Sequence, residues 1–215
     1  MATIFFPACK ILGKYPEISQ KIEAYLKLQF DDLKVESCCK TSLNRITSED
    51  TVIYICTSCV MYVRDNTPAK TLISLWEIID NDASFVLPNY KGKVVTIQDC
   101  WKVPNETRLQ DATRNLLEKM KIDVLELENN RKTADFCGKF LYDPDMKQFA
   151  KFSKHITQHQ DAFFKPHTDE AYIEIMKNHS RKITTDEVVC YCGACRDGLI
   201  DGGKSVFHLA ELVFS

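Results

Sequence analysis

Two similar stretches of the chain decide its fold: Thr51-Val-Ile-Tyr-Ile-Cys-Thr-Ser-Cys59 and Glu187-Val-Val-Cys-Tyr-Cys-Gly-Ala-Cys195. Each begins with a run rich in β-branched residues, which is typical of a buried strand, and ends in a Cys-x-x-Cys turn. The residues therefore predict two strands that each carry a pair of cysteines at the tip. A Cys-x-x-Cys turn can direct two sulfur atoms at one metal centre.

The similarity extends over both halves of the chain, which indicates an internal repeat. In each half, a short apolar run ends in cysteine and is followed by an amphipathic helix, a second short strand and a further cysteine. The matched strands are 4–9 with 95–100 and 33–35 with 122–125, the matched helices are 16–30 and 105–120, and the further cysteines are Cys39 and Cys137.

This alternation of strands and helices predicts an α/β fold with mostly parallel strands and with cysteines at the strand ends. We expect two pseudo-repeated lobes, 1–90 and 91–215. The second lobe is longer because of an insertion around 139–186, which we expect to be helical and to cover one site. A closing helix is expected over 206–214.

The composition is that of an ordinary globular protein. The chain has 215 residues, 45% of them hydrophobic, and its 28 basic and 30 acidic residues leave a net charge of −2. This balance does not favour nucleic acid as a partner. No apolar run approaches the roughly 18 residues of a membrane-spanning helix, and the first residues lack the basic leader of a signal peptide. We expect a cytoplasmic protein without a transmembrane segment.

Ten cysteines are the unusual feature of the composition. An even number could form disulfide bonds, as in secreted proteins. However, no export signal is expected, and the chain is longer than the small domains that need such crosslinks. The adjacent Cys38 and Cys39 are poorly placed to bond each other, because the bond would strain the peptide between them. Metal binding is therefore the preferred interpretation.

The order C…CC…CxxC, present twice with strands and helices in between, resembles the cysteine-rich CCG domain family. Its best-known member is the B subunit of heterodisulfide reductase, and relatives include iron–sulfur subunits of lactate and glycolate oxidation systems. The resemblance covers essentially the whole chain. It implies a non-cubane [4Fe-4S] cluster in the first lobe, where two thiolates bridge iron atoms. The implied cofactor-binding residues are Cys9, Cys38, Cys39, Cys56 and Cys59.

The second lobe departs from the family pattern, because Phe136 stands where the first of the paired cysteines is expected. Four thiolates suit a cubane [4Fe-4S] cluster or a structural zinc ion, and they also fit a site that has degenerated and is empty. The implied metal ligands of this lobe are Cys100, Cys137, Cys192 and Cys195.

Two further residues allow two interpretations each. Lys40 replaces the family's glycine beside the paired cysteines of the first lobe, where its charge would raise a cluster potential or attract an anionic substrate, unless it points into solvent. Cys190 aligns with Tyr54 on the strand before the second Cys-x-x-Cys turn. It is either a small buried hydrophobic residue or a replacement for the missing ligand.

The resemblance implies an iron–sulfur redox protein that acts in electron transfer, or on disulfides and thiols, as a subunit of a larger oxidoreductase. No catalytic residue beyond the cluster is expected. Because the chain has no flavin, nicotinamide or ferredoxin-type motif, we expect a partner subunit with flavin or iron–sulfur clusters, and a small disulfide or thiol as substrate. The alternative is a structural or scaffold module that holds zinc in one or both cysteine sites. A thiol–disulfide oxidoreductase with unligated Cys-x-x-Cys pairs lacks the thioredoxin context.

Overall fold

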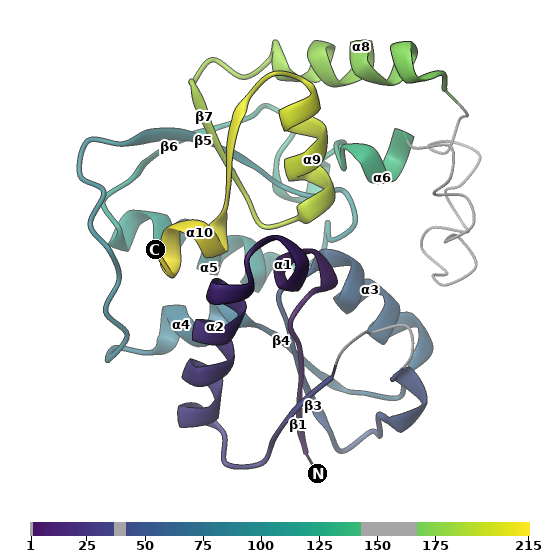
Figure 1. The fold of residues 1–215 in the computed structure, drawn as a ribbon, viewed down its shortest axis with the longest axis vertical. Coiled ribbons are helices and arrows are strands. Elements are labelled where there is room, and N and C mark those ends of the chain that lie inside the picture. The colour runs from purple at the N-terminus through teal and green to yellow at the C-terminus, as the bar shows by residue number, and fades with distance from the viewer. Residues whose placement is uncertain (1, 37–41, 143–166) are drawn as a thin grey trace.

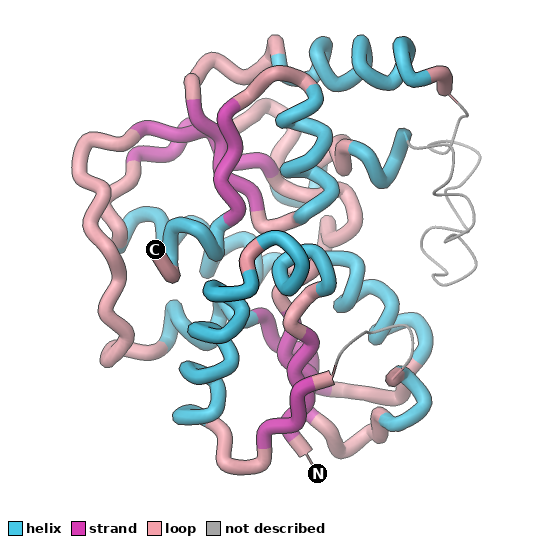
Figure 2. The backbone as a smooth tube through the Cα atoms, in the orientation of Figure 1, coloured by secondary structure: helices cyan, strands magenta, loops and turns pink. Residues whose placement is uncertain are grey.

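The computed structural model describes residues 2–36, 42–142 and 167–215, which form two α/β lobes (Figure 1). Each lobe has one four-stranded sheet, and every strand pair in both sheets is parallel. Figure 2 shows the two groups of strands with helices around them and between them. The predicted fold class is therefore confirmed.

The first lobe has the strand order β2-β1-β3-β4. Its central strand β1 is buried at all four residues, as expected for an apolar strand covered on both faces. Helix α2 begins at Pro16, whose missing N–H group costs nothing in a first turn. The elements are β1 (Thr3–Phe6), α1 (Cys9–Lys14), α2 (Pro16–Gln29), β2 (Leu33–Val35), the 3-10 turn η1 (Leu43–Arg45), β3 (Thr51–Tyr54), α3 (Thr57–Asn66), β4 (Thr71–Ser74) and α4 (Leu75–Asn81).

The second lobe repeats this order as β6-β5-β7-β8. Helix α5 lies in the place of α2 in the repeat, and its apolar face is buried along its whole length. The elements are β5 (Val94–Gln98), α5 (Thr107–Lys119), β6 (Asp123–Glu126), the 3-10 turn η2 (Arg131–Thr133), α6 (Lys139–Tyr142), α8 (Asp169–Ser180), β7 (Glu187–Cys190), α9 (Gly193–Asp201), β8 (Ser205–His208) and α10 (Leu209–Val213).

The repeat is closer than the sequence indicated, because each lobe ends in a fourth strand and a short capped helix. The side chains of Ser74 and His208 cap α4 and α10, and Glu77 and Glu211 complete the two capping boxes. The closing helix expected over 206–214 is therefore wrong in its first part: residues up to His208 pair with β7, and α10 begins after the cap.

The lobes meet at the carboxyl ends of their sheets. Helix α4 of the first lobe packs against α5 of the second, while α1 and α9 are joined by an ion pair of 2.6 Å between Lys14 and Asp197. Figure 1 shows α1, α2, α4, α5 and α10 in this contact region. Residues that follow the strand tips of one lobe therefore lie close to those of the other.

The insertion is helical in its described parts, α6 and α8, and α8 packs against α9. Residues 143–166 lie outside the described residues, so the expectation that the insertion covers one site stays a prediction. Among the helices of the described ranges, none combines the length and apolar character needed to cross a membrane.

Candidate metal centre

Four buried cysteines of the second lobe converge on one point. Their sulfur atoms all lie within 4.8 Å of one another, and Cys137 Sγ is 3.4 Å from Cys100 Sγ and 3.9 Å from Cys192 Sγ. All four side chains are essentially inaccessible to solvent. None of the eight described cysteines forms a disulfide bond. The tetrad consists of Cys100, Cys137, Cys192 and Cys195, the four residues that the sequence predicted for this lobe.

The topology explains this convergence. Cys100 lies just beyond the end of β5, Cys192 caps the N-terminus of α9 beyond β7, and Cys195 lies in the first turn of that helix. Strands β5 and β7 are adjacent and parallel, so their carboxyl ends deliver these residues to the same edge of the sheet. Cys137 arrives from the loop that leads into α6.

Gly138 allows the Cys137 loop to approach α9. Its φ of +45° lies in the left-handed region, and a Cβ atom at this position would stand 2.2 Å from the carbonyl oxygen of Ala194. Gly198, one turn further along α9, is equally close, because a Cβ there would lie 2.5 Å from the Cα of Gly138. Two glycines thus bring the loop and the helix into backbone contact beside the tetrad.

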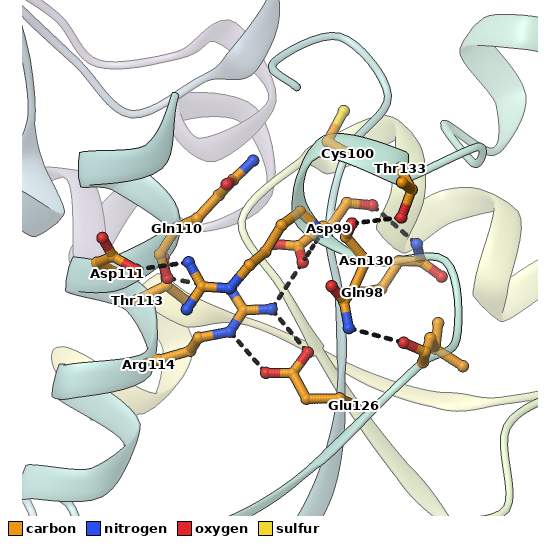
Figure 3. Close-up of polar contacts among 12 residues, drawn as sticks. Gln98, Asp99, Cys100, Gln110, Asp111, Thr113, Arg114, Glu126, Asn130 and Thr133 are labelled. Atoms are coloured by element: carbon orange, nitrogen blue, oxygen red, sulfur yellow. Dashed lines mark hydrogen bonds and ion pairs between the residues drawn. The ribbon is translucent and has the colours of Figure 1, made fainter. Parts of the chain in front are cut away.

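A buried carboxylate fixes the turn that carries Cys100 (Figure 3). Asp99 accepts hydrogen bonds of 2.7 Å from the Tyr191 hydroxyl, from Arg114 Nη2 and from the backbone N–H of Arg131. Arg114 also forms an ion pair of 2.6 Å with Glu126. Burial, followed by the charge of Asp99, raises the pKa of Tyr191, so its hydroxyl remains a donor. This network orients the turn in the way that hydrogen-bond partners orient metal ligands in proteins.

Lys102 brings a positive charge to the tetrad. Its side chain is buried, its Nζ donates a 2.7 Å hydrogen bond to Ser58 Oγ, and it lies 4.3 Å from the centroid of the Phe140 ring. Burial by itself would lower the pKa of this amine, but the nearby sulfurs, above all those of Cys137 and Cys192, raise it above its ordinary value. Lys102 is therefore positively charged, and its contacts with Ser58 and Phe140 hold the charge in place.

Three thiols of the tetrad have shifted pKa values, and the shifts differ in direction. Burial opposes ionisation of Cys192, but hydrogen bonds from Cys100, Cys137 and Cys195 and the charge of Lys102 lower its pKa well below the ordinary value. Burial and the neighbouring sulfurs raise the pKa of Cys137 and of Cys195. Cys192, at the N-terminus of α9, is therefore the one of these three thiols that ionises most readily, and a helix N-terminus favours negative charge.

The first-lobe cysteines are only partly described. Cys9 is exposed at the first residue of α1, Cys56 is the half-buried cap of α3, and Cys59 is buried one turn into that helix. Cys38, Cys39 and Lys40 lie outside the described residues. Within the ranges given above, the second-lobe tetrad is the only set of three or more Cys, His, Asp or Glu side chains whose ligand atoms converge. The five-cysteine site stays a prediction.

The two sets of cysteines nevertheless adjoin. The Cys100 thiol lies 3.6 Å from Thr57 Oγ1, the residue that follows Cys56. A hydrogen bond from Cys59, followed by the charge of Lys102, lowers the pKa of Cys56 to about 6, although burial and Cys192 oppose this shift. Cys56 is thus poised to ionise near neutral pH at the boundary between the lobes.

The structure also settles where Phe136 and Cys190 lie. Phe136 is buried and stacks on His179, with ring centroids 3.7 Å apart, while the Nε2 atom of that histidine lies 2.6 Å from Gln98 Oε1. Cys190 is fully buried, pairs with His208 across the sheet, and donates to the carbonyl of Cys192. Its sulfur is not part of the tetrad. Of the two interpretations of Cys190, the structure therefore agrees with that of a small buried residue.

Sequence reasoning missed Lys102, Asp99 and Arg114. Lys102 had one signal, a lone lysine in the apolar turn between Trp101 and Val103 directly after a predicted ligand. Comparison of the chain with protein-family models and with curated proteins finds no match. The site is therefore interpreted from its own geometry and chemistry.

Proposed function

We propose that the protein is a metal–thiolate redox protein of the heterodisulfide reductase B type. In this proposal, the first lobe holds a non-cubane [4Fe-4S] cluster, and the second lobe holds one zinc ion in the tetrad. The single observation that carries the proposal is the convergence of four buried, unbridged cysteines at the boundary between the lobes. Buried thiols gathered in this way are typical ligands of zinc and iron.

The spacing of the tetrad favours one ion over a cubane cluster. Zinc with four sulfur ligands at about 2.3 Å requires sulfur–sulfur separations of about 3.8 Å. The two separations from Cys137, 3.4 and 3.9 Å, lie on either side of this value, and no two sulfurs of the tetrad are more than 4.8 Å apart. A cubane places an iron atom beneath each thiolate and sulfides between the irons, and so needs its thiolates farther apart. The spacing of the buried tetrad is therefore closer to that of a mononuclear tetrahedral centre than to that of a cubane.

The first lobe would supply the working centre. Cys56 and Cys59 begin α3 and Cys9 begins α1, so all three occupy the positions that the repeat assigns to ligands. When bound, an iron–sulfur cluster supplies one-electron chemistry to a sulfur-containing substrate. A hydrogen bond from Cys59 and the charge of Lys102 lower the pKa of Cys56 to about 6, against the effect of burial, which favours its use as a thiolate ligand. Cys9 itself is exposed, which supports access of a small disulfide or thiol to this residue.

An electron-transfer partner completes the proposal. The sequence has no motif for flavin, nicotinamide or a chain of conventional clusters. A subunit that carries flavin or iron–sulfur clusters would therefore supply or accept electrons. The second candidate function is a structural zinc module. The tetrad is the one observation that favours it, because the spacing of the tetrad sulfurs suits zinc.

The test is anaerobic purification followed by metal and sulfide analysis and electron paramagnetic resonance. We expect one zinc per chain together with iron and acid-labile sulfide. Cys137→Ser should remove the zinc and Cys38→Ser should remove the iron signal, while Cys190→Ala is the matched control because this buried cysteine lies outside the tetrad. Zinc without iron or sulfide would refute the redox function and favour the structural module. A chain with neither metal would refute both.

A further inference from the structure

The strongest unassigned feature is the buried ammonium group of Lys102. Lysine is rarely buried without a charged partner. The described residues place no carboxylate within ion-pair distance of Lys102, whose contacts there are the neutral Ser58 hydroxyl and the face of the Phe140 ring. Lys102 follows Cys100 by two residues, and its partner Ser58 adjoins Thr57, whose hydroxyl oxygen lies 3.6 Å from the Cys100 sulfur, so the tetrad is next to this ammonium group.

The charge balance of a metal–thiolate centre gives this ammonium a role. Four thiolates around a divalent ion leave a net charge of −2, which is costly in a site without solvent. One buried ammonium reduces this charge by half. Because the four cysteines are buried, water and salt provide little compensation, and groups of the protein supply it, of which a buried ammonium carries the largest positive charge.

The first lobe holds this cation in place. Ser58 lies in the first turn of α3 and accepts the 2.7 Å hydrogen bond from Lys102 Nζ, and the neighbouring Thr57 hydroxyl contacts Cys100. Lys102 follows Cys100 by two residues, so its backbone belongs to the second lobe. The cation is thus carried by one lobe and positioned by the other.

We propose that Lys102 is the counter-ion of the second-lobe metal centre and that Ser58 of the first lobe positions it. The inference rests on the proposed metal binding by the tetrad. It assigns to Lys102 a positioning and charge-compensating role and no contact with the metal. The metal site of one lobe is then complete only when the other lobe is folded against it.

The experiment measures cobalt binding to the full chain in a Cys38→Ser, Cys39→Ser background, which removes the paired cysteines predicted for the first lobe. Co²⁺ reports tetrathiolate binding through its visible and charge-transfer absorption. Lys102→Met should weaken Co²⁺ binding about 10- to 100-fold, the usual range for loss of a group that supports metal ligands. Ser58→Ala should weaken it less, because the ammonium remains. Lys204→Met is the matched control, since Lys204 donates only to the carbonyls of Ile183 and Thr185, at the opposite end of the lobe.

Thermal unfolding separates this role from a purely structural one. Without metal, Lys102→Met should unfold at the parent's temperature or above, because methionine fills the site without a buried charge. With metal, its gain in unfolding temperature should be smaller than that of the parent and of Lys204→Met. Equal Co²⁺ affinity in Lys102→Met and the parent would overturn the counter-ion role while leaving the metal proposal intact. A parent chain that binds no Co²⁺ would overturn both.

Discussion

Gly138→Ala is the sharpest test of the packing that forms the tetrad. The residue follows Cys137 directly and has a φ of +45°. Its added Cβ would lie 2.2 Å from the Ala194 carbonyl oxygen and 3.1 Å from the Cα of Gly198. All of these contacts are backbone atoms, so no side-chain rotation can relieve the overlap. Either the Cys137 loop or the first turn of α9 has to move.

Two costs add in this variant. An alanine in the left-handed region costs about 1–2 kcal/mol relative to glycine, and overpacking of a close contact costs about 1–3 kcal/mol. The free energy of unfolding should therefore fall by roughly 2–5 kcal/mol. For a chain of this size, each kcal/mol lowers the unfolding temperature by about 2–4 °C. Metal affinity should fall as well, because the displaced elements carry Cys137 and Cys195.

Gly92→Ala is the matched control for this variant. Gly92 also has a positive φ, of +90°, but no atom lies within 4 Å of the position that an added Cβ would occupy. It should therefore show only the conformational cost, about 1–2 kcal/mol, and normal metal content. Thermal unfolding of both variants, with zinc analysis of each, gives the comparison. Equal losses in the two variants, with full zinc in Gly138→Ala, would refute the close-approach argument.

Three further predictions follow from the charges in and around the site. Asp99→Asn should cost about 3–5 kcal/mol in chemical denaturation, because it leaves Arg114 partly uncompensated in a buried site; Asp111→Asn, on an exposed ion pair of the same helix, should cost little. Burial lowers the pKa of both His179 and His208 from 6.5 to about 4. Stability from these neutral imidazoles is complete above pH 6.5 and is lost as pH falls towards 4, by about 3 kcal/mol each; a urea midpoint that does not change between pH 7 and 4.5 would contradict this. The raised pKa values of Cys137 and Cys195 require their protons to leave when metal binds. Zinc affinity should therefore increase with pH, and calorimetry in buffers of different ionisation enthalpy should detect proton release.

The cysteine spacing predicted the tetrad because the positions of the cysteines along the chain reflect the order of the strands in the sheet. In a parallel sheet all strands point the same way, so residues just after Gln98 and Cys190 must meet at one edge. The repeat then assigned Cys137 to the same place from its position after the second strand of the lobe. These inferences used only short-range patterns, which a single sequence contains.

The groups around the sulfurs could not be predicted in this way. Asp99 and Tyr191 are 92 residues apart, and Lys102 and Ser58 are 44 residues apart and in different lobes. The first pair depends on how distant segments of one lobe pack and the second on how the two lobes pack, and no local pattern predicts either. The strand β8 was missed for a related reason: residues 206–208 lead into a capping box at His208 and read as part of the helix until their pairing with β7 is known.

Zinc-edge X-ray absorption of the anaerobically purified protein tests the central claim most directly, because it reports only the atoms around the zinc. Four sulfur neighbours at about 2.3 Å, with no nitrogen or oxygen ligand and no nearby metal, are the predicted result. A zinc shell that contains nitrogen or oxygen, or a zinc signal unchanged in Cys137→Ser, would contradict the assignment of the tetrad as a metal centre.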